Sequence, residues 1–128
     1  MMKGTYRNAT DAANHTVDDG WGTLTWLANE PLTGNKGLTL GRVVIRQGKA
    51  NPRHCHPTCE EVLYLLRGKL RHTLGGDAVT LNPGDTLSIP AGVFHNAVNI
   101  GDEDADMIVA YSTGRRDFQL EHSSVANE

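Results

Sequence analysis

Three histidines and a glutamate stand where they could hold one metal ion. His54 and His56 are one residue apart, so in an extended chain their side chains point to the same side. The adjacent acids Glu60 and Glu61 open the next apolar run, and His95 comes from a later run. Three neutral imidazoles and one carboxylate suit divalent Fe, Mn, Ni, Cu or Zn without choosing among them.

The charge of such a site indicates what it would bind. A doubly charged ion with one carboxylate ligand keeps a positive charge, and an octahedral ion with four protein ligands has two free positions. We therefore expect a small polar or anionic metabolite that binds through oxygen, such as a carboxylate, a hydroxyketone or an enolate.

Short apolar runs separated by Gly and Pro must position these ligands. The runs are too short for helices and predict an all-β sandwich or barrel. A hairpin is expected at Gly75 to Asp77 and a turn at Asn82 to Gly84. The predicted strands are Leu38–Gln47, Val62–Leu66, Leu70–Leu74, Val79–Leu81, Thr86–Ile89, Val93–Val98 and Met107–Tyr111, with a further strand-like alternation at Trp21–Leu27.

Composition limits the classes of function. The 128 residues suffice for one domain, and a net charge of −3 without a basic cluster argues against nucleic-acid binding. No apolar run reaches the roughly 20 residues needed to cross a bilayer, and no signal segment is visible at the start, so we expect a cytoplasmic protein without membrane association. Cys55 and Cys59 are then expected to be reduced thiols.

Two blocks of the sequence resemble the paired motifs of the cupin superfamily. The first comprises Gly48, His54, His56, Glu61 and Gly68, and the second comprises Gly84, Pro90, Gly92, His95 and Asn99. The resemblance implies a double-stranded β-helix barrel of jelly-roll type, with the metal inside near one mouth. The first motif places six residues between its glutamate and Gly68, which selects Glu61 rather than Glu60 as the fourth ligand. The resemblance leaves both cysteines outside the ligand set.

The resemblance also suggests how the chain is organised. We expect an N-terminal arm and first strands over residues 1–37, the cupin barrel over 38–114, and a C-terminal tail over 115–128 that frays from His122 onward. Residues 62–66 and 43–45 are apolar on both faces, which a lone small barrel would leave in water. A homodimer would cover them, with the N-terminal segment Thr5–Leu27 exchanged with the partner or laid on it.

Four further residues are candidates for roles in the pocket. His72 alternates with apolar neighbours and could act as an acid or base, or be a core histidine satisfied by hydrogen bonds. Tyr111 ends the last strand, where its hydroxyl could reach the pocket or simply pack. Arg42 could neutralise a substrate anion at the barrel mouth or remain in solvent, and Phe94 could line a dry substrate pocket.

The sequence favours a metalloenzyme of dioxygenase type. One alternative is a non-oxidative isomerase or lyase acting on a sugar or keto acid, with His72 or Tyr111 as proton shuttle. Another is a noncatalytic module that binds a metabolite. The same ion would serve all three, so these residues alone leave the reaction open.

Overall fold

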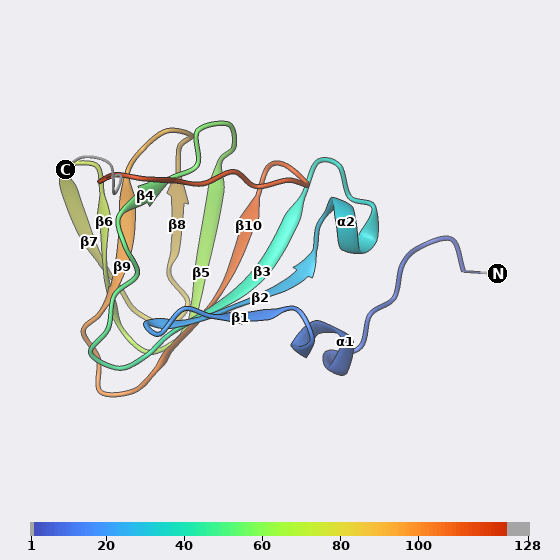
Figure 1. Cartoon of the computed structure of the whole chain (residues 1–128). Helices are drawn as coiled ribbons and strands as arrows, with labels where there is room; N and C mark the ends of the chain where they lie inside the picture. Colours follow the sequence, from blue (N-terminus) through green and yellow to red (C-terminus); the bar gives the residue numbers. More distant parts are fainter. Residues whose placement is uncertain (1, 123–128) are drawn as a thin grey trace.

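The computed structural model describes residues 2–122 as two facing antiparallel sheets with two short helices (Figure 1). The helices are α1 (Ala9–Ala13) and α2 (Glu30–Thr33). The strands are β1 (Thr16–Asp18), β2 (Gly22–Ala28), β3 (Thr39–Ile45), β4 (His54–Cys55), β5 (Glu61–Arg67), β6 (Leu70–Leu74), β7 (Asp77–Leu81), β8 (Thr86–Ile89), β9 (His95–Asn99), β10 (Ala105–Tyr111) and β11 (Gln119–Leu120). The all-β prediction is confirmed, and the predicted strands appear with small shifts at their ends.

The two sheets close around one interior. The first has the order β1-β2-β3-β10-β5-β8 and the second β11-β4-β9-β6-β7. Strand alternation decides what faces inward: along β5, Leu63 and Leu65 are buried, while Val62, Tyr64 and Leu66 are more than 40% exposed. The buried side chains of β3, β5 and β10 in the first sheet and of β6, β7 and β9 in the second therefore form one core between the sheets.

Two residues of the motifs are explained by the backbone they support. Gly68 has φ +93°, and a Cβ there would lie 2.8 Å from the Cα atom of Ala105, so the position between β5 and β6 requires glycine. The buried Asn99 donates from Nδ2 to the carbonyls of Ile45 and Glu103, each at 2.9 Å. These residues hold the barrel's shape and lie away from the ligand cluster.

The N-terminal segment is integrated into the chain's own barrel. Asn8 caps α1, with its side chain accepting from the amide of Asp11 at 2.9 Å, and β1 then pairs with β2 at the edge of the first sheet. Arg7 donates to the carbonyl of Leu27 at 2.7 Å. The backbone and side chains of residues 7–28 thus bond to each other within one chain, and the exchange or laying of Thr5–Leu27 on a partner stays a prediction.

The C-terminal segment is also part of the barrel. Residues 114–122, here called the strap, cross one end of the barrel from α2 toward β4, as the dark red segment in Figure 1 shows. Within the strap, β11 pairs with β4, and Glu121 accepts from Arg53 at 2.7 Å. The predicted C-terminal tail is thus bound to the barrel as far as residue 122. The predicted fraying begins at His122, and residues 123–128 lie outside the described residues. No helix in the described part of the chain is both long and apolar enough to cross a bilayer.

Candidate metal centre

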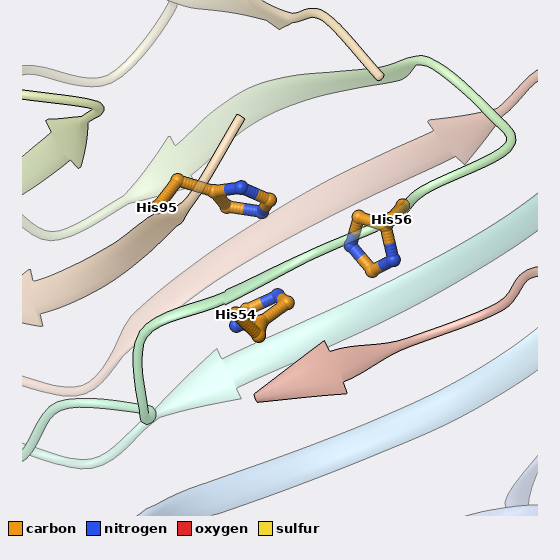
Figure 2. A group of neighbouring side chains, drawn as sticks. All are labelled: His54, His56 and His95. Atoms are coloured by element: carbon orange, nitrogen blue, oxygen red, sulfur yellow. The ribbon is translucent and has the colours of Figure 1, made fainter. Parts of the chain in front are cut away.

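Three imidazoles from two neighbouring strands converge inside the barrel. His54 lies on β4 opposite His95, the first residue of β9, and His56 follows two residues after His54 on the same side. Figure 2 shows the three rings turned toward one another. One nitrogen from each lies within 4.8 Å of the others, and the residues are 7%, 3% and 2% exposed in chain order. This spacing allows a single ion to bind all three.

Backbone carbonyls determine which ring nitrogen of each histidine carries a hydrogen. Nδ1 of His54 lies 2.7 Å from the carbonyl of Pro52, Nδ1 of His56 lies 2.7 Å from that of Asp117, and Nδ1 of His95 lies 2.9 Å from that of Val93. A carbonyl oxygen can only accept, so each Nδ1 carries a hydrogen, and in the neutral form of each ring Nε2 presents a lone pair. Ligating histidines are commonly oriented by such bonds.

Glu61 completes the cluster from the start of β5. Its Oε1 lies 3.2 Å from Nε2 of His56 and 3.2 Å from Nε2 of His95, and the residue is 5% exposed. Burial on its own raises the pKa of this carboxyl, whereas hydrogen bonds and positive charge from His56 and His95 lower it to about 2 when Nε2 of those rings carries a proton. A cation bound between these nitrogens and Glu61 would keep the carboxylate ionised in the same way.

The cluster fits a metal ion because its inward atoms are all acceptors. With hydrogens fixed on Nδ1, the Nε2 lone pairs of His56 and His95 face a carboxylate oxygen at 3.2 Å, an arrangement that repels unless a cation or an added proton lies between. Nε2 of His56 is buried and has no hydrogen-bond partner among residues 2–122. Burial lowers the pKa of His54 to about 4, so that ring is neutral and able to ligate at pH 7.

A cavity of about 580 Å³ opens beside the cluster. His72 and Tyr111, predicted as pocket residues, both line it and are nearly fully buried. The ring of His72 stacks on His95 with centroids 5.7 Å apart, and the ring of Tyr111 meets His56 edge-on at 4.9 Å. Burial raises the pKa of Tyr111 well above its ordinary value, so its hydroxyl keeps its proton.

Two predicted substrate-binding residues do not reach the cavity. Arg42 lies on the outward face of β3, where its guanidinium forms two hydrogen bonds of 2.8 and 2.7 Å with Asp106 on β10. The suggested role at the barrel mouth is corrected, because strand parity turns its side chain away from the interior. Phe94, directly before His95, likewise takes the opposite parity and is absent from the cavity wall. Cys55 and Cys59 are buried free thiols outside the histidine cluster.

The strap contributes wall residues that the sequence analysis did not identify. Arg116, Phe118 and Leu120 all line the cavity, and Phe118 stacks on His54 with centroids 4.9 Å apart. The carbonyl of Asp117 in the same segment holds His56. Arg116, Phe118 and Leu120 are two residues apart, a spacing typical of an extended segment with one face toward the cavity.

Fold and site together define a metal-binding β-barrel of the double-stranded β-helix class, and comparisons with known proteins agree. The sequence profile of the cupin domain matches residues 41–111. This chain belongs to the cupin family. The divalent transition metal expected from the sequence is consistent with the three buried imidazoles.

Known relatives are longer than this chain. Germin-like protein 3-5 of Oryza sativa subsp. japonica is 33% identical over 95 residues, which cover 68% of this chain and 42% of that protein. Oxalate oxidase GF-2.8 of Triticum aestivum is 30% identical, with the same coverage. The chain thus spans about two fifths of these relatives' length. The solved structure of Lactobacillus farciminis oxalate decarboxylase in a formate complex superposes with a TM-score of 0.79 at 19% identity, covering 88% of this chain and 35% of that one.

Proposed function

We propose that this cupin is a metal-dependent enzyme that oxidises a small anionic metabolite in a reaction of dioxygenase type. The observation that carries the proposal is the buried cluster, in which ring nitrogens of His54, His56 and His95 lie within 4.8 Å of one another and the Glu61 carboxylate lies 3.2 Å from Nε2 of His56 and of His95. An ion held by His54, His56, His95 and Glu61 would supply Lewis-acid and redox chemistry at one end of the cavity. The relatives named oxalate oxidase support a small carboxylate as the class of substrate.

The chain's own residues would orient the substrate and keep water away. Apolar side chains such as Leu63, Met107 and Val109 line the cavity, and the strap covers one end. The Tyr111 hydroxyl, kept protonated by burial, would donate a hydrogen bond to a substrate oxygen and would not serve as a base at neutral pH.

A non-oxidative isomerase or lyase is the second candidate because of His72. Its Nδ1 lies 2.9 Å from the carbonyl of Thr73, which places the hydrogen there and leaves Nε2 with a lone pair. Burial lowers the pKa of His72, so the ring is a neutral base beside His95. Such a base could move a proton on a bound keto acid or sugar without dioxygen.

Elemental analysis of protein purified without chelators tests the site first. We expect about one transition metal ion per chain in the wild type and a large loss in His56→Ala, with His15→Ala as an exposed-histidine control. Unchanged metal content in His56→Ala would refute the site. Oxygen consumption by Fe(II)- or Mn(II)-loaded protein with oxalate and other small carboxylates supports the first candidate, whereas anaerobic turnover supports the second. Ligand binding without turnover would indicate the noncatalytic module.

We also propose that the protein pairs as a homodimer through the outer face of β5. Val62, Tyr64 and Leu66 form a row there, 42%, 44% and 42% exposed. Covering such a row removes apolar surface from water. Sedimentation at micromolar concentration should give the mass of two chains, and a monomer would contradict this proposal.

A further inference from the structure

Arg116 of the strap is held in a box of aromatic rings. Its Cζ atom lies over the ring of Trp26 at 4.8 Å from the centroid, and over the rings of Tyr111 and Phe118 at 5.5 Å each. Rings on several sides restrict the guanidinium, while the N–H groups in its plane stay available to a planar anion. The arginine is therefore positioned in advance for a ligand.

Arg116 has no acidic partner among residues 2–122. Five other arginines form ion pairs with carboxylates of 3.0 Å or less: Arg42, Arg46, Arg53, Arg67 and Arg115. No carboxylate oxygen of the described residues lies within 4.0 Å of the Arg116 guanidinium. A half-buried cation in a cavity wall is costly to leave unpaired, so its position favours an anion from outside the chain.

The guanidinium lies one ring away from two metal ligands. The Tyr111 ring, 5.5 Å from Arg116, is 4.9 Å from the ring of His56, and the Phe118 ring, also at 5.5 Å, is 4.9 Å from the ring of His54. The distance from Cζ of Arg116 to the centre of either imidazole is therefore at most the sum of the 5.5 Å and 4.9 Å distances. A molecule of a few carbon atoms could therefore reach from the metal cluster to Arg116.

Neither of the two acids in the cavity wall neutralises the charge of Arg116. Glu61 is committed to the imidazole cluster, and the other acid in the wall is Asp19, in the turn before β2. Strand β2 separates Asp19 from Arg116. From Gly22 to Trp26 the strand extends over ~13 Å. Asp19 lies beyond the Gly22 end and Arg116 at the Trp26 end, so the two charges are not neighbours.

We infer that Arg116 is an anion-binding subsite and that the cavity takes a small dianion, a dicarboxylate or an oxo-dicarboxylate. One carboxylate lies toward the ion held by the histidines and the other accepts hydrogen bonds from Arg116. This inference rests on the proposed function, since it requires the metal for one of the two contacts. It narrows the substrate class from small anions in general to those with two anionic groups.

Calorimetric titration of Mn(II)-loaded protein tests the subsite without requiring turnover. The probes are oxalate, malonate, succinate and glutarate as dianions of increasing length, and acetate as a monoanion. We expect at least one dianion to bind the wild type more tightly than acetate does. Arg116→Gln should weaken that binding about 10- to 100-fold, because a lost hydrogen bond to a charged group costs this much, while changing acetate binding little.

Arg115→Gln is the matched control, because it removes the same charge from the next residue, whose guanidinium lies 3.0 Å from Glu30. It should leave dianion binding unchanged. Arg116→Lys should restore only part of the affinity, since an ammonium lacks the planar pair of donors. Thermal unfolding with and without Mn(II) confirms that each variant is folded and loaded.

Several results would overturn the inference. These are a loaded wild type that binds no dianion better than acetate, or an Arg116→Gln variant that keeps wild-type affinity for all four dianions. Either result would contradict the subsite without contradicting the proposed metal site. A wild type that retains no metal would overturn the proposed function, and the titrations repeated on that apoprotein would then decide the subsite: binding dependent on Arg116 supports it, and binding independent of Arg116 refutes it.

Discussion

Replacing Glu61 by glutamine is the most direct test of the fourth ligand. The side chain keeps its shape but loses its charge at a position 5% exposed and 3.2 Å from two imidazole nitrogens. If Glu61 binds the ion, its carboxylate oxygen would stand about 2.2 Å from a doubly charged centre. Even with the dielectric constant of water, that attraction is about 4 kcal/mol.

An amide oxygen recovers part of this attraction, so we expect Glu61→Gln to lower metal affinity by about 100-fold or more, equivalent to about 3 kcal/mol. The metal-free protein should respond differently. Removing a buried charge that faces acceptor lone pairs should leave the melting temperature of the apoprotein unchanged or raise it. A residue that was only structural would instead lower stability and metal affinity together.

The assay is competition for Zn(II) or Mn(II) against a chelator of known affinity, with thermal unfolding in excess chelator as the second measurement. Glu60→Gln is the control, because Glu60 is the adjacent acid and is exposed. Its metal affinity should match the wild type. Metal affinity of Glu61→Gln within roughly threefold of wild type would refute the assignment of Glu61 as a ligand.

Two further predictions concern the barrel and the strap. Leu65 is 0% exposed, so Leu65→Ala should lower the free energy of unfolding by about 2–5 kcal/mol in denaturant titrations, while Leu66→Ala, 42% exposed, should cost about 0.5 kcal/mol; equal losses would contradict the assigned parity of β5. Hydrogen bonding to Arg53 lowers the pKa of Glu121 below its ordinary 4.5, so the pair stabilises the strap above pH 4.5 and loses that effect as pH falls through the lowered pKa. Hydrogen-exchange protection of the residue-121 amide, which donates to the carbonyl of Arg53 at 3.1 Å, should fall accordingly in acid. In Glu121→Gln it should be low at neutral pH as well. Protection that stays unchanged in acid and in the variant would show that the pair does not hold the strap.

The sequence predicted the metal cluster better than the rest of the cavity. His54, His56 and His95 could be placed because motif spacing and strand parity fix both their position and their side, and the two-residue alternation of β5 separates Leu65 from Leu66 in the same way. Parity also contains the answer for Arg42: Gly41, Val43 and Ile45 are buried, so Arg42 must face outward.

The strap could not be predicted with the same ease. Residues 114–122 contain one two-residue strand and several charged side chains, a composition typical of a loose tail. Its position depends on contacts distant in sequence, such as Arg53 with Glu121 and His56 with the carbonyl of Asp117. Such pairings between remote segments leave little trace in local composition, so the position of Arg116 in the cavity wall follows only from the packing around it.

The bond between His56 and the carbonyl of Asp117 makes the strap and the metal ion mutually dependent. The carbonyl fixes the ring that ligates, so a closed strap strengthens metal binding, and by thermodynamic reciprocity a bound ion must favour the closed strap to the same extent. Removing an ion held by His56 would therefore also weaken one contact of the segment that carries Arg116 and Phe118. The pairing of β11 with β4 and the bond of Arg53 to Glu121 would still hold that segment in place.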